Sequence, residues 1–181
     1  MKKFEEKTLS TNKIFAGKII DLQVDKVSLP NGETSKRELI KHPGAVAVIA
    51  LNSAKELILV EQYRKPLELS ILEIPAGKIE PNEKPEKTAL RELEEETGYT
   101  TKELRYITSF YTSPGFADEI IHIYYTDQLE QLKEPVIGDA DEFVEVHKLS
   151  GEQIKQALSS QAIYDAKTIY AIQYLEIKGI F

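Results

Sequence analysis

The most informative stretch of the chain runs from Gly77 to Tyr99 and reads G-K-I-E-P-N-E-K-P-E-K-T-A-L-R-E-L-E-E-E-T-G-Y. Five residues separate Gly77 from Glu83, seven more precede Arg91, and R-E-L-E-E-E-T-G then follows without a break. Chance rarely produces a spacing that fixes two glycines, an arginine and several glutamates. We therefore interpret the stretch as a motif that carries chemistry.

The motif predicts a helix with one apolar face. Pro85 suits the first helical turn, and Gly98 suits the left-handed position just past the helix end. The residues expected to face a core recur at helical spacing and are Ala89, Leu90, Leu93 and Thr97.

The same helix predicts a row of carboxylates. Glu92 and Glu96 are four residues apart, so they share one face, with Glu95 beside them and within reach of Arg91. Carboxylates so close repel each other unless one keeps a proton or a cation joins them. Oxygen ligands of this kind suit Mg²⁺ or Mn²⁺. A solvated acidic helix without chemistry is the alternative, and we expect Glu94 to be the solvated member in either case.

The spaced pattern resembles the signature box of the Nudix hydrolases, which use divalent metal to cleave nucleoside diphosphates linked to another group. The last box position is usually aliphatic and is Tyr99 here. Further segments resemble the ADP-ribose pyrophosphatases of that superfamily, above all Pro114, which lies downstream of the box where that subfamily has a characteristic proline. The other matching segments are R-E-L-I at 37–40, V-E-Q-Y-R at 60–64, G-D-A-D-E-F-V-E-V at 138–146 and D-A-K-T at 165–168.

Hydrophobic patterns along the chain indicate an α/β fold with a mixed sheet. Residues 14–29 alternate like a strand, 30–32 form a turn, and 34–41 return as its partner. The resemblance implies a Nudix-type α/β/α sandwich with an N-terminal β-hairpin extension. We expect residues 1–43 to form the N-terminal strand and hairpin region, and residues 44–181 to form the hydrolase domain.

By resemblance, the metal ligands are Glu92, Glu96 and the backbone carbonyl of Ala76. Glu142 is the loop carboxylate that completes the metal site or activates the attacking water. The general base stays open, because some members carry a second acid where this chain has Ala140, with Asp139 and Asp141 as substitutes. Glu83 and Glu95 are candidates to orient the metal ligands.

The resemblance also suggests substrate-binding residues, which are Arg37, Glu38, Arg64, Ser113, Pro114, Gly115 and Glu119. Arginines match phosphate oxygens with two parallel hydrogen bonds. Arg37 and Arg64 would contact phosphate or ribose, although Arg37 could instead form a surface ion pair with Glu38, and Arg64 with Glu61. Residues 113–115 and Glu119 would shape the terminal ribose pocket, although Pro-Gly also favours a simple turn.

Composition limits the other possibilities. The chain has no cysteine, which excludes thiolate chemistry and disulfides, and its net charge of -7 argues against broad nucleic-acid binding. No apolar run is long enough for a membrane span, and no signal peptide is evident, so a cytoplasmic protein is expected.

The expected reaction is metal-dependent hydrolysis of ADP-ribose to AMP and ribose 5-phosphate, with Mg²⁺ as cofactor and Mn²⁺ as a possible substitute. The alternatives are a broader nucleoside-diphosphate-sugar or dinucleotide pyrophosphatase, or a non-catalytic module that senses ADP-ribose. Subfamily members resemble one another in forming dimers through their N-terminal strands, so we expect a homodimer.

Overall fold

The computed structural model describes residues 3–134, 136, 138 and 143–181. Contacts divide the chain into two compact units. The first comprises Met1–Gly44 together with Phe110–Ile121, and the second comprises Ala45–Ser109 together with His122–Phe181. Nothing in the sequence indicates that residues 110–121 belong with the N-terminal region.

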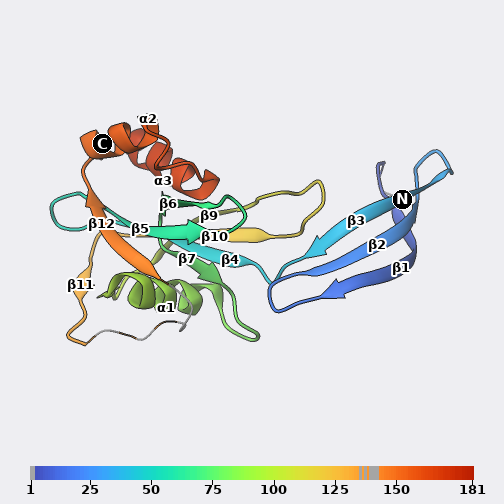
Figure 1. Ribbon diagram of the computed structural model, residues 1–181, viewed down its shortest axis with the longest axis horizontal. Helices are drawn as coiled ribbons and strands as arrows, with labels where there is room; N and C mark the ends of the chain where they lie inside the picture. Colours follow the sequence, from blue (N-terminus) through green and yellow to red (C-terminus); the bar gives the residue numbers. More distant parts are fainter. Residues whose placement is uncertain (1–2, 135, 137, 139–142) are drawn as a thin grey trace. The chain divides into compact units, whose positions relative to one another are not determined.

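The first unit contains a three-stranded antiparallel sheet (Figure 1). Its strands are β1 (Lys7–Ala16), β2 (Asp21–Ser28) and β3 (Thr34–Lys41), in the order β1-β2-β3. Gly32 adopts the left-handed conformation (φ 89°) in the turn between β2 and β3, as its place after Pro-Asn predicts. The single strand predicted over residues 14–29 is wrong. The Gly17 N–H donates to the Ile20 carbonyl at 3.0 Å, and this turn divides the segment into β1 and β2.

Residues 110–121 are attached to the end of β3 by backbone hydrogen bonds. The Ile40 N–H donates to the Phe116 carbonyl at 2.8 Å, and the Asp118 N–H donates to the Ile40 carbonyl at 3.2 Å. The Asp118 side chain then accepts hydrogen bonds from the His42 N–H at 2.9 Å and the Lys41 ammonium at 2.8 Å. Hydrogen bonds to the end of β3 and to His42 therefore fix the position of residues 116–118.

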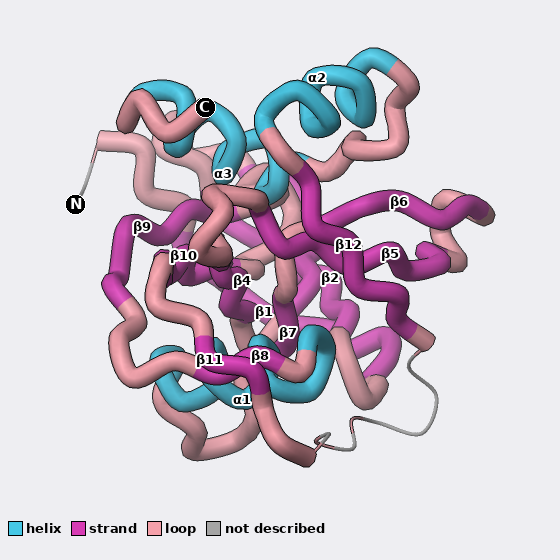
Figure 2. Tube along the Cα trace, turned by 90° about the vertical axis from the view of Figure 1, so that its left-hand side faces the viewer, coloured by secondary structure: helices cyan, strands magenta, loops and turns pink. Residues whose placement is uncertain are grey.

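The second unit has helices on both sides of its sheets (Figures 1 and 2). One sheet has the order β7-β4-β10-β9, a second has the order β12-β5-β6, and β11 pairs with β8. The strands are β4 (Ala45–Ala50), β5 (Leu57–Arg64), β6 (Leu69–Glu73), β7 (Ala76–Lys78), β8 (Tyr99–Thr100), β9 (Arg105–Tyr111), β10 (Ile120–Thr126), β11 (Glu130–Gln131) and β12 (Val144–Leu149). Residues 110–111 of β9 and 120–121 of β10 belong to the first unit. Helix α1 (Pro85–Thr97) lies on one side, and α2 (Gly151–Ser159) and α3 (Ala166–Ile177) lie on the other. The α/β prediction is confirmed.

The boundaries of α1 follow the sequence signals. Pro85 occupies the first turn, and Gly98 ends the helix with φ 69° while its N–H donates to the Glu94 carbonyl. Ala89 and Leu93 are fully buried against the apolar side chains of β4 and β5. Leu90 is only half-buried, whereas Thr88, Glu92 and Glu96 are buried, so the buried face includes polar residues that the apolar pattern did not predict.

The two C-terminal helices each begin at a side-chain cap. Ser150 and Gln153 form a capping box at the start of α2. The Asp165 side chain accepts hydrogen bonds from the first turn of α3. No helix within the described ranges combines the length and apolar character that a membrane crossing requires.

Candidate metal and active site

Gly77 and Glu92 are in direct contact, and this contact explains why the motif begins with glycine. A Cβ added at Gly77 would lie 1.9 Å from the carboxyl carbon of Glu92 and 2.1 Å from Oε1. No side chain larger than hydrogen fits there while Glu92, which is 7% exposed, keeps its position. The motif therefore brings the strand backbone of β7 against a carboxylate of α1.

Glu96 lies one turn further along α1 and has both carboxylate oxygens oriented by neutral donors. The Gln62 side-chain amide on β5 donates to Oε1, and the Ala76 N–H on β7 donates to Oε2 at 2.9 Å. Glu96 is 7% exposed, like Glu92. Two strands from two different sheets therefore hold this carboxylate in one orientation.

Arg91 forms ion pairs with three glutamates of the motif. Its guanidinium contacts Glu83 at 3.1 Å, Glu92 at 2.8 Å and Glu95 at 2.9 Å. The predicted pair between Arg91 and Glu95 is confirmed. The hydrogen bond with Glu83 makes the largest contribution to the raised pKa of Arg91, and the Arg91 hydrogen bond in turn lowers the pKa of Glu83. Glu83 also accepts a hydrogen bond from Thr88 at 2.8 Å, which fixes its orientation.

The prediction that Glu94 is the solvated member of the row is wrong. Its Oε1 accepts a hydrogen bond from the Thr100 hydroxyl at 2.5 Å, and the residue is half-buried. Glu94 therefore links α1 to β8, on a different side from Glu92 and Glu96.

The residues around Gly77 fit a hard divalent cation. Glu92 and Glu96 supply carboxylate oxygens from one helix face, and the strand that carries Ala76 runs beside them. Position 77 must be glycine because any side chain there would displace the carboxylate of Glu92, which is a potential metal ligand. The donor set consists of oxygen atoms, which matches Mg²⁺ or Mn²⁺ better than softer ions.

Arg64 forms an ion pair with Glu73, and not with Glu61, the glutamate that the sequence suggested. Its Nε and NH2 groups donate to the two oxygens of Glu73 at 2.5 and 2.8 Å. Lys167, at the start of α3, also donates to Glu73 and lies 3.0 Å from Asp165. Burial raises the pKa of Glu73, but the Arg64 hydrogen bonds and the Lys167 charge outweigh burial and leave it lowered. The Arg64 side chain remains 40% exposed, so part of its guanidinium is accessible.

The other predicted substrate-binding residues belong to the first unit. Arg37 binds Glu6 through two hydrogen bonds at 2.6 and 2.9 Å and donates to Ser35. Glu38 is exposed and, as the next residue of β3, points to the opposite face. The two residues therefore do not share one face of the sheet.

Ser113 and its neighbours form a compact turn in the same unit. The Ser113 carbonyl accepts hydrogen bonds from the N–H groups of Phe116 at 3.1 Å and Ala117 at 2.9 Å. Glu119 accepts a hydrogen bond from the Thr112 hydroxyl at 2.5 Å and lies 3.6 Å from His42. Pro114 and Gly115 are exposed at the tip of this turn. Glu142, Asp139 and Asp141 lie outside the described residues.

Three residues of the site region were missed by the sequence reasoning. Gln62 orients Glu96, Glu73 binds Arg64, and Lys167 joins that pair from α3. The V-E-Q-Y-R and D-A-K-T segments contain Gln62 and Lys167, so the signal was present as a resemblance. Glu73 lacked any signal beyond its place at the end of an apolar run.

Comparisons with known proteins agree with this geometry. The NUDIX domain model matches residues 41–170, and the model of the nucleoside diphosphate sugar hydrolase N-terminal domain matches residues 6–40. The chain is 58% identical over 178 residues to an ADP-ribose pyrophosphatase of Bacillus subtilis (strain 168), covering 98% of this chain and 96% of the relative. It is 54% identical to a methanol dehydrogenase activator of Bacillus methanolicus, with the same coverage.

A solved structure supports the fold. The crystal structure of an ADP compounds hydrolase superimposes with a TM-score of 0.82, at 20% identity and with coverage of 98% of this chain and 97% of that chain. At that identity the likeness concerns the fold alone. The family model spans the box and most of the second unit, and the close relatives match along nearly the full length. The chain therefore belongs to the NUDIX domain family, as a Nudix hydrolase.

Proposed function

We propose that the protein hydrolyses the pyrophosphate bond of ADP-ribose to give AMP and ribose 5-phosphate. The observation that carries the proposal is the arrangement of Glu92 against Gly77, one turn from Glu96 with its two fixed oxygens. The substrate follows from the ADP-ribose pyrophosphatase that is 58% identical to this chain over nearly its whole length.

Glu92, Glu96 and the carbonyl of Ala76 would hold Mg²⁺, with Mn²⁺ as a possible substitute. Bound there, the cation supplies positive charge to the pyrophosphate oxygens and makes water more acidic. Gln62 and the Ala76 N–H keep the Glu96 carboxylate in position for this role. Since these donors are fixed before substrate arrives, little reorganisation is needed during the reaction.

Other side chains have roles in proton transfer and binding. Glu142 accepts the proton of the attacking water, and Glu95 and Glu83 hold Arg91 so that the carboxylate row keeps its geometry. The hydrogen bonds with Glu73 are the main cause of the raised pKa of Arg64. The negative charge of Glu96 makes a smaller contribution in the same direction. We infer that the exposed part of the Arg64 guanidinium donates to a phosphate of the substrate. We assign Arg37, Glu38, Ser113, Pro114, Gly115 and Glu119 to substrate recognition.

The reaction is tested by turnover with Mg²⁺ on a panel of substrates. ADP-ribose is compared with GDP-mannose, a diadenosine polyphosphate and NADH, and the products are identified by chromatography. The expected result is preferential hydrolysis of ADP-ribose to AMP and ribose 5-phosphate. Preference for another substrate would contradict the specificity, while tight ADP-ribose binding without hydrolysis under Mg²⁺ or Mn²⁺ would indicate a sensor.

We further propose that the chain forms a homodimer through the sheet of its first unit. All ten residues of β1 are exposed, and they include Leu9, Ile14 and Phe15. An edge strand with exposed apolar side chains favours association with another chain. Sedimentation at micromolar concentration should give a dimer mass. Ile14→Glu should shift the mass to that of a monomer, whereas Ile177→Glu, at an exposed site in the second unit, should not. A monomeric wild-type protein would contradict the proposal.

A further inference from the structure

A second group of potential metal ligands lies on strands β5 and β12. Among the described residues, Glu61, Glu145 and His147 each offer one ligand atom, and these atoms all lie within 4.8 Å of one another. Successive side chains of a strand point to opposite faces. Since Gln62 points toward Glu96, its neighbour Glu61 is on the other face of β5, away from the box carboxylates.

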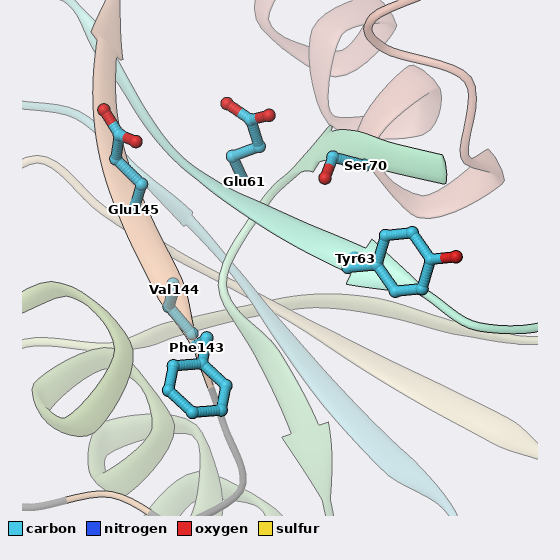
Figure 3. A pocket seen from close by; sticks show the side chains of 6 residues that line it. All are labelled: Glu61, Tyr63, Ser70, Phe143, Val144 and Glu145. Carbon is cyan, nitrogen blue, oxygen red and sulfur yellow. The ribbon is translucent and has the colours of Figure 1, made fainter. Parts of the chain in front are cut away.

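The register of the two strands brings these groups together. Glu61 and Glu145 are directly opposite each other in the antiparallel pair, and His147 follows two residues after Glu145 on the same face. Figure 3 shows the carboxylates of Glu61 and Glu145 pointing to the same side of the strands. The imidazole Nε2 lies 3.1 Å from Glu61 Oε2 and 3.9 Å from Glu145 Oε1.

This arrangement has an electrostatic cost unless a positive charge lies between the carboxylates. Like charges directly opposite each other on two strands destabilise the pair. In addition, Nε2 of His147 is shielded from solvent and makes no hydrogen bond of acceptable geometry with any described residue. A cation bound by the three groups would relieve the repulsion and satisfy the buried nitrogen.

An open space adjoins the cluster. A pocket of about 540 Å³ is lined by Glu61 and Glu145 together with four neighbours, which are Tyr63 of β5, Ser70 of β6, Val144 of β12 and Phe143 just before β12 (Figure 3). A cation held by three side chains would therefore have room for water or a ligand atom at a fourth position.

We propose that Glu61, Glu145 and His147 form a second divalent-cation site, separate from the box and selective for Zn²⁺-like ions. An imidazole with two carboxylates is a donor set that zinc accepts, whereas Mg²⁺ prefers oxygen ligands alone. Zinc ligands lie about 2.0–2.2 Å from the ion, so the present separations require small side-chain rotations without movement of the strands. A bound ion would link β12 to β5 and stabilise the second unit.

Calorimetric titration with Zn²⁺ in excess Mg²⁺ tests this site, using the wild-type protein and a Glu92→Gln/Glu96→Gln variant. Both proteins should bind one equivalent of Zn²⁺, and Zn²⁺ should raise their melting temperatures. His147→Gln should weaken this binding by about tenfold or more and abolish the thermal shift. Glu61→Gln should weaken binding in the same way and serves as the second variant if His147→Gln does not fold.

The matched control is His122→Gln, which removes another half-buried histidine of the second unit. It should leave Zn²⁺ affinity unchanged. The proposal is wrong if neither starting protein shows saturable Zn²⁺ binding, or if His147→Gln and Glu61→Gln bind as tightly as their parent. Because binding is measured, the outcome does not depend on the hydrolytic function proposed above.

Discussion

Two groups of charged side chains in the second unit differ in their charge balance. At the start of α3, the carboxylates of Glu73 and Asp165 face the cations of Arg64 and Lys167. On α1, the single guanidinium of Arg91 contacts three carboxylates, those of Glu83, Glu92 and Glu95. Burial alone does not separate the two groups, because Glu73, Glu92 and Glu96 are each less than a tenth exposed.

The difference indicates two uses of buried charge. A balanced group can join β5, β6 and α3 by its own ion pairs, although such a group is weak evidence for net stability. The group on α1 has more carboxylates than cationic side chains, so it can bind a metal cation. The α1 carboxylates should therefore matter most for turnover, and Glu73 should matter most for stability.

Glu96→Gln should have the largest effect on activity. Removing one ligand charge should lower turnover of ADP-ribose by about a thousandfold, or ~4 kcal/mol in the activation barrier. The melting temperature should stay near that of the wild-type protein. Glu94→Gln on the same helix is the control and should retain turnover within a few-fold, because Glu94 bonds Thr100. Near-normal turnover of Glu96→Gln would show that the metal-site assignment is wrong.

Gly77→Ala should lower turnover by about a hundredfold, or ~3 kcal/mol, because the new Cβ would displace the Glu92 carboxylate. If this is the cause, Gly77→Ala should lower turnover little further in a protein that already carries Glu92→Ala. The short side chain at position 92 then leaves space for the Cβ at position 77. A double-mutant cycle measured by turnover tests this coupling. Fully additive losses would mean that Gly77 acts by some route other than Glu92.

Glu73→Gln should destabilise the protein by about 3 kcal/mol, since it removes the buried negative charge that Arg64 and Lys167 share. The exposed pair of Lys65 and Glu68 supplies the control, and Glu68→Gln should cost under ~0.5 kcal/mol. Both values come from denaturant unfolding at neutral pH. Equal values for the two variants would contradict the structural role of Glu73.

The pKa of Glu73 also predicts a pH dependence. The pKa is lower in the folded protein than its usual value of 4.5, so the folded state favours the ionised form. Ionised Glu73 contributes fully to the free energy of unfolding above about pH 4.5. This contribution is lost as the pH falls through the lower pKa that Glu73 has in the folded protein. The stability difference between wild-type and Glu73→Gln proteins should shrink over this acid range. A difference that stays constant there would contradict the lowered pKa.

Gln62→Ala should have the smallest of these effects on activity, about tenfold, or ~1.4 kcal/mol. It removes one donor from Glu96 while the Ala76 N–H remains. Gln128→Ala removes an exposed amide that binds Glu103 and should leave turnover unchanged. An effect of Gln62→Ala no larger than that of the control would show that Glu96 needs no orientation by β5.

The sequence predicted the parts that depend on local signals. Pro85 and Gly98 set the limits of α1, and residues 30–32 form the turn that leads into β3. Helical spacing also placed Glu92 and Glu96 on one face. These features depend on residues close in sequence, where periodicity and capping are decisive.

Contacts between distant segments were not predictable in the same way. The pairing of Gln62 with Glu96 and of Glu73 with Lys167 joins residues far apart in the chain. The bond from Thr100 to Glu94 lies closer in sequence but depends on the path of the chain after α1. Likewise, the turn at Gly17 interrupts a pattern that still alternates, so periodicity alone could not reveal it. Polar partners of this kind depend on packing of whole elements.

We expect the carboxylates of α1 to bind the cation and Glu73 not to bind it. Anomalous scattering of Mn²⁺ in crystals grown with that ion tests this expectation. We predict a Mn²⁺ peak coordinated by Glu92, Glu96 and the carbonyl of Ala76, with Glu73 still bound to Arg64. A fully occupied Mn²⁺ at Glu73, or none at Glu92 and Glu96, would contradict this expectation.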